Sequence, residues 1–465
     1  MVGREHESGI PTTRERVFGS GEGGHLTHRG CVMTDALWDS LFPHTPRSAH
    51  PIHVPRCAKS MRVWVYDLPR TYNSELLRRM ELRRGASSCD YERSSCVETV
   101  RSRPRRDGWD YSNLRQYAAE IPLLAKLLQL PRARTPQEAD LFVVPYLAST
   151  ELSGHQYTPW YPREKRVAER FERLLVMLDH FRGAARARHL FLSSRDWTFT
   201  VVKLKELVAS SGALMASYGP KRADAHNEII VAPNSAGFGA SLQPLTHPAS
   251  IFLFSMMDES INPIRQDVGR ELRRLRSRPN LRVEYHSIGD HRSISLSPLN
   301  ASRLMSDSLL CPIIQGDLPY QHRLFDALAA GCVPLLLRYI VNVGGKACEA
   351  WSWDARNKSA MRGVARVTLD YSICVRQHLP FPLSVDWDAI TVRIDASALA
   401  TPGLLAEMIA ALDREEVARK RRRLERMRHL FVYDREGQTF DAFSAFMVEV
   451  CDVLRALPAR RLTAR

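Results

Sequence analysis

Residues 311–334 read CPIIQGDLPYQHRLFDALAAGCVP and predict the end of a strand, a loop, a helix and a new strand in immediate succession. The apolar run at 308–312 leads into the loop, and apolar residues recur at three- and four-residue spacing across 320–330, as on one face of a helix. Another apolar run, 332–337, follows directly. This order is typical of a parallel sheet, in which ligands bind beyond the carboxyl ends of the strands.

The loop and the first helical turn of this stretch have the chemistry of an anion site. Gly316 allows the backbone to approach a ligand closely, and Asp317 follows it. The first N–H groups of a helix have no helical partners and attract anions. Arg323 adds a guanidinium fork suited to a diphosphate, and Asp326 could accept hydrogen bonds from ribose hydroxyls. An ordinary strand–loop–helix unit with a solvated arginine accounts for the same residues. The neighbouring elements are needed to distinguish this interpretation from an anion site.

Strands and helices alternate in two series along the chain. Strands are expected at 61–69, 139–147, 189–194, 214–217 and 228–233, and then at 250–256, 282–287, 308–312 and 332–337. A segment rich in proline and serine, 232–250, separates the series like an interdomain linker. The pattern predicts an α/β protein with two Rossmann-like domains facing across a cleft. Arg265 opens the helix after the strand at 250–256, and two arginines at one sheet edge indicate a phosphate-bearing ligand.

These signals divide the chain into four parts. Residues 1–60 are rich in Gly, Pro, His, Ser and charge and predict a disordered leader. We expect residues 61–245 to form the first domain and 246–400 the second, while 401–465 hold helices and a basic tail. The sequence shows no run of 18 apolar residues and no signal segment, so no membrane anchor is visible in it.

The charge and the cysteine content of the sequence limit which partners and metal sites can be expected. The 465 residues include 66 Lys and Arg against 51 Asp and Glu, a net charge of +15, and such a surface attracts polyanions. Zinc-finger, RNP and GXXG signatures are missing, so no nucleic-acid partner is expected. None of the nine cysteines forms a CxxC pair, which argues against structural zinc. Cys89 and Cys96 could close a small disulfide or remain two surface thiols.

The motif order from Ser308 to Pro334, with SLLCP, GD, RLFDAL and AGCVP, resembles the signature of the exostosin-like glycosyltransferases. These enzymes build heparan sulfate backbones in animals and transfer sugars onto wall polymers in plants and algae. Further similar blocks are VWVYDLP at 63–69, RTPQEADLFVVPYL at 134–147, SRDW at 194–197, NEIIVAP at 227–233 and LPF with DW at 379–387. The resemblance covers about residues 61–450.

The resemblance implies a GT-B fold and inverting transfer of a hexosyl or pentosyl group from a nucleoside diphosphate-sugar to a glycan or glycoprotein acceptor. It implies no metal-binding DxD motif, so no cofactor or metal is expected. Residues 61–245 would then be the acceptor-side domain and 246–400 the nucleotide-sugar-binding domain. The donor-binding residues would be Arg265, Gly316, Asp317, Arg323 and Asp326. Family members usually reside in the Golgi apparatus, which is the expected location here, and homo- or hetero-oligomers both remain open.

The catalytic base is expected in the first domain. Asp196 is the candidate, because it follows the end of a predicted strand, although a carboxylate there could instead cap the next helix. Asp67, Glu151 and His155 are the alternatives.

Several departures from the family pattern support a second hypothesis, a catalytically impaired relative that binds a glycan or nucleotide-sugar. Residues 255–258, SMMD, stand in place of a glycine-rich turn, and Arg195 replaces a histidine. Gln315 and Leu318 replace polar residues beside the glycine–acid pair. A nucleotide-sugar epimerase is disfavoured, because DLPRTYN at 67–73 lacks the GxGxxG fingerprint.

Overall fold

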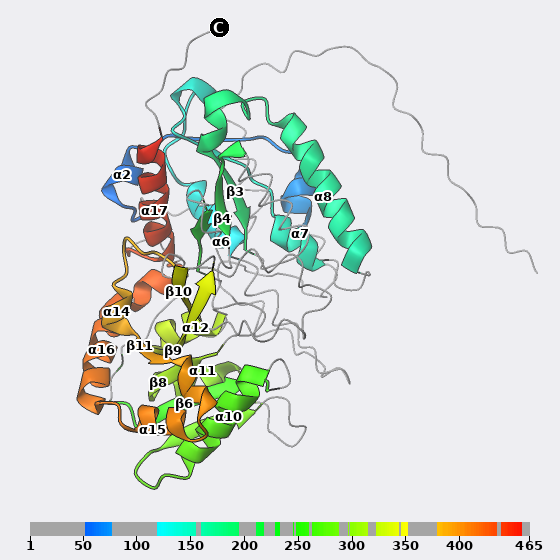
Figure 1. Cartoon of the computed structure of the whole chain (residues 1–465). Coiled ribbons are helices and arrows are strands. Elements are labelled where there is room, and N and C mark those ends of the chain that lie inside the picture. The colour runs from blue at the N-terminus through cyan, green and yellow to red at the C-terminus, as the bar shows by residue number, and fades with distance from the viewer. Residues whose placement is uncertain are drawn as a thin grey trace, which may run out of the picture.

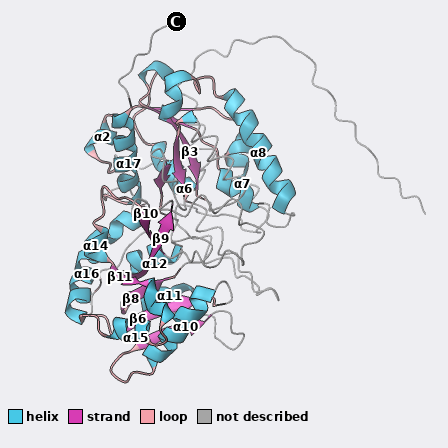
Figure 2. Cartoon of the chain, in the orientation of Figure 1, coloured by secondary structure: helices cyan, strands magenta, loops and turns pink. Residues whose placement is uncertain are grey.

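A computed structural model shows two α/β domains, one above the other in the view of Figure 1 and coloured by secondary structure in Figure 2. It describes residues 52–76, 119–154, 160–194, 211–217, 228–232, 245, 248–259, 263–287, 296, 298–314, 322–343, 346–351, 379–434 and 439–457. Most of the leader, Cys89, Cys96, the helix expected at 199–210 and most of the linker lie outside these residues.

The first domain contains a parallel sheet of five strands in the order β1-β2-β3-β4-β5. The strands are β1 (Val63–Val65), β2 (Leu141–Val143), β3 (His189–Ser193), β4 (Leu214–Ser217) and β5 (Glu228–Ile230). The helices are α2 (Arg56–Lys59), α6 (Glu120–Leu127), α7 (Ala148–Gly154) and α8 (Trp160–Met177), with 3-10 turns η1 (Arg70–Tyr72), η2 (Pro136–Glu138) and η3 (Gly183–Arg188). Strands β2, β3 and β4 are buried along their whole length, as parallel strands with both faces covered must be.

The second domain is built on a six-stranded sheet. Its strands are β6 (Ile251–Met257), β7 (Val283–Ser287), β8 (Ser308–Ile313), β9 (Val333–Val343), β10 (Lys346–Trp351) and β11 (Val392–Asp395). Its helices are α10 (Pro263–Arg276), α11 (Pro298–Ser306), α12 (His322–Ala330), α14 (Trp387–Ile390), α15 (Leu404–Ala410) and α16 (Arg414–Met427), with η7 (Ala396–Ala400) and η8 (Arg428–Phe431).

The parallel strands of this sheet run in the order β7-β6-β8-β9-β11. The chain therefore winds outward in one direction from β6 to β7 and in the other from β8 onward. Alternate side chains enter two different cores: Leu253 and Leu335 pack with α10 and α15, whereas Phe254 and Leu336 belong to the core that includes α12. This is the doubly wound arrangement, with its reversal of strand order between β6 and β8.

A disulfide closes the strand–helix–strand unit that the sequence predicted around residues 311–334. Cys311 on β8 is bonded to Cys332, directly before β9, and β8 pairs with β9 in parallel so that Cys311 faces Pro334. Helix α12 ends at Ala330, and the next residue, Gly331, has a φ of +74°, the left-handed conformation that glycine adopts most readily after a helix end. The disulfide thus links the chain before the loop that holds Gly316 and Asp317 to the chain after α12.

The last helix, α17 (Ala442–Ala456), returns to the first domain. Figure 1 shows α16 beside the second sheet and α17 next to α2. Cys451 on α17 forms a disulfide with Cys57 on α2, and Ser444 Oγ donates a hydrogen bond of 2.7 Å to the carbonyl of His53. The C-terminal segment thereby belongs to both domains.

A buried ion pair fixes the start of α17. The Lys126 ammonium lies 3.1 Å from a carboxylate oxygen of Asp441, and their side chains are only 6% and 1% exposed. The same carboxylate accepts hydrogen bonds from the backbone N–H groups of Ser444 and Asp434. Burial raises the pKa of Asp441, and the charge of Lys126 and these hydrogen bonds work against that rise.

Most described strands and helices agree with the sequence predictions, but strands β10 and β11 of the second sheet and helices α2, α7 and α14 were not predicted. The strand predicted at 332–337 continues to Val343 and pairs antiparallel with β10. The signal for this hairpin is the pair Gly344-Gly345 between two β-rich runs, which is typical of a two-residue hairpin turn. No helix among the described residues is long and apolar enough to cross a lipid bilayer.

Replacing Asp441 with asparagine tests the buried pair. The variant leaves the Lys126 ammonium without its carboxylate, and breaking a buried pair costs about 3–5 kcal/mol. The free energy of unfolding, measured by urea denaturation, should fall by about that amount. Combining Asp441→Asn with Lys126→Met removes the stranded charge and should recover much of the loss. An unchanged urea midpoint for Asp441→Asn would show that the pair does not stabilise the fold.

Candidate functional site

The candidate site lies at the carboxyl edge of the second sheet, where β6 and β8 are neighbours. Helix α10 follows β6 and α12 follows β8, and the two helices pack into different cores. In doubly wound sheets, ligands bind outside the carboxyl ends of the strands at this reversal of strand order. Both arginines predicted from the sequence are on these two helices.

Arg265 and Arg323 influence each other electrostatically. Arg265 on α10 is only 2% exposed, and its Nη1 donates a hydrogen bond of 3.2 Å to the carbonyl of Asp258. Arg323 is half-buried at the start of α12. Burial, and then the positive charge of Arg265, lower the pKa of Arg323 to about 10, although Asp326 and Asp258 oppose the shift. The structure thus brings together Arg265, Arg323 and Asp326, as the sequence predicted.

A histidine that the sequence analysis passed over belongs to the same cluster. His322 is the first residue of α12, and its Nδ1 lies 3.1 Å from Oδ2 of Asp326, one helical turn later. Side chains four residues apart on a helix face the same side, and this spacing was the signal available in the sequence.

Other predicted residues lie outside the described part of the chain. Among the predicted site residues these are Asp196, Gly316 and Asp317, together with His155, Arg195, Gln315 and Leu318. Strand β8 ends at Ile313 and α12 begins at His322, so the structure describes the two ends of the predicted donor loop.

The carboxyl edge of the first sheet carries two of the alternatives for the base. Asp67 follows β1 and is exposed. Glu151 on α7 is buried; it accepts a hydrogen bond of 2.7 Å from the Tyr146 hydroxyl, and Arg170 Nε lies 3.2 Å from its other oxygen. Glu120 accepts hydrogen bonds from two backbone N–H groups at the start of α7, and burial raises its pKa to about 7. Glu151 is therefore part of a buried network, whereas Asp67 faces solvent.

The turn after β6, which differs from the usual glycine-rich turn, is fixed by a carboxylate. Glu259 receives two hydrogen bonds from Arg273 on α10, at 2.6 and 3.1 Å, and one from the Tyr285 hydroxyl on β7. Burial raises the pKa of Glu259, but these hydrogen bonds outweigh it and the net shift is downward. A Cβ at Gly269 would lie 2.7 Å from Glu259 Cδ, so glycine leaves room for the carboxylate. The Asp258 carbonyl that holds Arg265 belongs to this turn.

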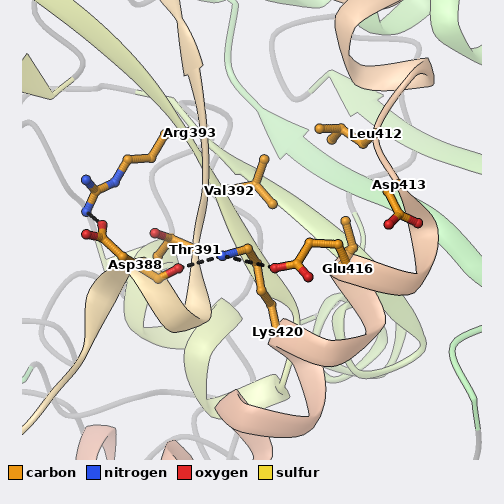
Figure 3. A pocket seen from close by; sticks show the side chains of 9 residues that line it. Asp388, Thr391, Val392, Arg393, Leu412, Asp413, Glu416 and Lys420 are labelled. Atoms are coloured by element: carbon orange, nitrogen blue, oxygen red, sulfur yellow. Dashed lines mark hydrogen bonds and ion pairs between the residues drawn. The ribbon is translucent and has the colours of Figure 1, made fainter.

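The described residues also form a cavity of about 300 Å³ elsewhere on the second domain. Its lining residues are Asp388, Thr391, Val392, Arg393, Leu412, Asp413, Glu416, Val417 and Lys420. Figure 3 shows Arg393 paired with Asp388, and Lys420 between the Asp388 carbonyl, at 2.5 Å, and Glu416, at 3.8 Å. The charged groups here thus pair with one another, and no predicted site residue lines the cavity, so we place the site at the β6–β8 edge.

The late block of the sequence, LPF with DW, supports the second domain structurally. Trp387 Nε1 donates a hydrogen bond of 3.0 Å to the carbonyl of Pro380, and the ring of Phe381 stacks against Phe431 of η8. Asp386 caps α14 by accepting from the N–H of Ala389. These residues connect the end of the second domain to the segment that leads into α17.

Comparison with protein-family models gives a match to the Exostosin GT47 domain over residues 57–409. The chain belongs to the exostosin GT47 family. The match covers well over half of the 465 residues, begins at Cys57 and includes every strand of both sheets. A search of curated proteins returned no match. The GT47 domain makes this protein a glycosyltransferase, so a sugar donor and a glycan acceptor are its expected ligands.

Replacing Arg273 with alanine tests whether its hydrogen bonds to Glu259 stabilise the turn between β6 and α10. The change leaves Glu259 without its two charged donors, and the free energy of unfolding should fall by about 1–2 kcal/mol in chemical denaturation. Arg270→Ala is the matched control, because Arg270 is on the same helix in an exposed pair with Asp267, and it should cost less than about 0.5 kcal/mol. Equal losses in the two variants would contradict a special role for Glu259.

Proposed function

We propose that this GT47 protein is an inverting glycosyltransferase of the GT-B type, which moves a hexosyl or pentosyl group from a nucleoside diphosphate-sugar to a hydroxyl of a glycan or glycoprotein. The observation that carries the proposal is the convergence of Arg265 and Arg323 at the reversal of strand order. A diphosphate is the anionic part of such a donor, and this edge is where a doubly wound sheet binds its ligand.

The charges at this edge support a diphosphate ligand. Two guanidinium groups that are partly removed from water repel each other, as the lowered pKa of Arg323 indicates. An anion bound between them relieves this repulsion and receives charge-assisted hydrogen bonds, which are stronger than neutral ones. The same positive charge stabilises the nucleoside diphosphate as it departs. The loop amides near Gly316 and Asp317 would add further donors, and Asp326 would contact the ribose or nucleotide.

The path of the C-terminal segment supports the GT-B assignment. Two domains each hold a parallel sheet, and α17 leaves the second domain to pack against α2 of the first. The donor would bind the second domain and the acceptor the first, with the reaction between them.

Inversion follows from a single displacement at the anomeric carbon. The acceptor oxygen forms a bond to this carbon as the bond to the diphosphate oxygen breaks, and the electron pair leaves with the diphosphate. A base takes the proton of the acceptor hydroxyl. We assign this base to Asp196, which comes three positions after the last residue of β3 in the sequence. This displacement requires no metal ion, and none is assigned a role here.

The two disulfides support residence in the Golgi lumen. Disulfides form and persist in oxidising compartments such as the secretory pathway. Cys311 and Cys332 are buried, and Cys57–Cys451 joins residues 394 positions apart in the chain.

A second candidate function is donor or glycan binding without transfer. The observation that favours it is the end of β6, where residues 255–258 stand in place of a glycine-rich turn and the next residue, Glu259, is held by two hydrogen bonds from Arg273. Incubation with labelled nucleotide sugars and glycan acceptors separates the two functions: binding with neither hydrolysis nor transfer would favour the second.

Arg323→Ala tests the donor site. Because Arg323 would donate two charge-assisted hydrogen bonds to the diphosphate, its loss should weaken binding of the donor by about 10- to 100-fold, as measured by calorimetry. Arg323→Lys keeps the charge but not the fork and should give an intermediate loss. Arg282→Ala, at the amino edge of the same sheet beside Ser250, should leave the affinity unchanged. A similar loss in Arg282→Ala would remove the diphosphate role from Arg323.

Asp196→Asn tests the base. Proton transfer by a positioned base contributes about 10²- to 10⁴-fold, so the transfer rate should fall by that factor while donor affinity stays the same. Asp67→Asn is the comparison, because Asp67 is an exposed carboxylate at the same sheet edge. If Asp67→Asn abolished transfer and Asp196→Asn did not, the role of base would pass to Asp67.

A further inference from the structure

We propose that His322 is a third, titratable cation of the donor site, so that binding of a nucleotide-sugar is accompanied by uptake of a proton. The inference rests on the proposed donor site at the β6–β8 edge. It concerns how that site responds to pH and which group, besides the two arginines, recognises the diphosphate.

The geometry places His322 next to the diphosphate-binding group. It is the residue before Arg323 and opens α12, the helix whose N-terminus faces the predicted donor loop. Asp326 Oδ2 lies at an ion-pair distance of 3.1 Å from Nδ1, without the angles of a hydrogen bond. Nε2 is then the ring nitrogen that would donate to a phosphate oxygen. The side chains of His322 and Asp326 are 44% and 16% exposed, so solvent protons can reach the pair.

The charges around His322 nearly cancel when no donor is bound. On its own helix it interacts with the carboxylate of Asp326 and the guanidinium of Arg323. One negative and one positive group therefore act on it directly, while Arg265 of α10 and Asp258 of the turn after β6 act on its neighbour Arg323. Burial lowers the pKa of His322 below its usual value, the charge of Asp326 opposes this, and Arg323 reinforces it.

Charged groups on the other elements packed against α12 are exposed or interact with partners other than His322. Arg303 on α11 is exposed. Arg428 of η8 and Arg421 of α16 donate to the carbonyls of Ala329 and Gly331, at the far end of the helix, and His429 interacts with Asp441. On β9, Arg338 pairs with Asp395.

A bound diphosphate changes this balance. It adds two negative charges beside His322, and an added negative charge favours the protonated imidazole. The pKa of His322 therefore rises on binding, and the linked equilibrium takes up a proton. By the same linkage, affinity for the donor falls as pH rises through the pKa of the bound state, by at most about tenfold per pH unit for one proton.

Isothermal titration calorimetry of the full chain tests the inference. The probes are UDP-glucose, UDP-galactose, UDP-N-acetylglucosamine, UDP-glucuronic acid and GDP-mannose, whose diphosphates do not titrate near neutral pH. The one that binds most tightly is titrated at several values between pH 5.5 and 8, in pairs of buffers with different ionisation enthalpies. The wild type should take up as much as one proton per bound donor, with a maximum between the pKa values of the free and bound states.

Three variants identify the group that takes up the proton. His322→Gln should bind the donor without proton uptake, and with an affinity that no longer depends on pH in this range. Asp326→Asn removes the negative charge that favours protonation and should shift the maximum uptake to lower pH. His286→Gln is the matched control, because His286 also lies near a carboxylate, that of Glu284 at 3.8 Å, but on β7, on the other side of β6. It should behave as the wild type.

The outcomes separate this inference from the function on which it rests. Donor binding without proton uptake by the wild type, or uptake that persists in His322→Gln, would overturn the role of His322 and leave the donor site intact. If no nucleotide-sugar of the panel bound, the donor site and the inference would both be overturned.

Discussion

The placement of two parallel strands side by side, β6 and β8, is the constraint on which the rest of the second domain depends. Because the chain continues from β6 to one side and from β8 to the other, α10 and α12 must cover opposite faces of the sheet. Their N-terminal turns nevertheless begin at the same edge. Two like charges, Arg265 and Arg323, therefore meet at a place where neither helix alone would put them. The fold holds them together against their repulsion, which the anionic donor of the proposed site would relieve.

The surroundings of these arginines differ from one another in a way that suits different tasks. Arg265 is almost completely buried and is tied to the Asp258 carbonyl, so its position depends on the turn that Glu259 fixes. Arg323 is half-buried and begins a helix whose preceding loop is bracketed by a disulfide. In the proposed donor site, the buried Arg265 would define where the diphosphate binds, and the more accessible Arg323 would adjust to it.

The sequence was sufficient to predict most strands of the two sheets and to place Arg265 and Arg323 at one sheet edge, where they act on each other. Buried parallel strands appear as short apolar runs, and residues just past their carboxyl ends share one edge. The sequence was not sufficient to predict contacts between residues that are brought together only by strand pairing or by the packing of distant segments. Glu259 meets Tyr285 only because β6 and β7 are adjacent, and the pairing of Cys57 with Cys451 spans 394 positions, which no local spacing indicates. His322 and Asp326 were within reach of sequence reasoning, since their separation of four residues is a helical contact.

The disulfide between Cys57 and Cys451 has a consequence for motion between the domains. It joins the beginning and the end of the folded chain, so that the covalent structure is a closed ring that passes between the domains twice, once between β5 and β6 and once between η8 and α17. The bond keeps α17 attached to α2 even where the non-covalent contacts between them are broken, so the second crossing stays fixed to the first domain. Apolar residues of both domains also belong to one continuous core, so any opening of this glycosyltransferase must separate packed side chains as well as move two chain crossings.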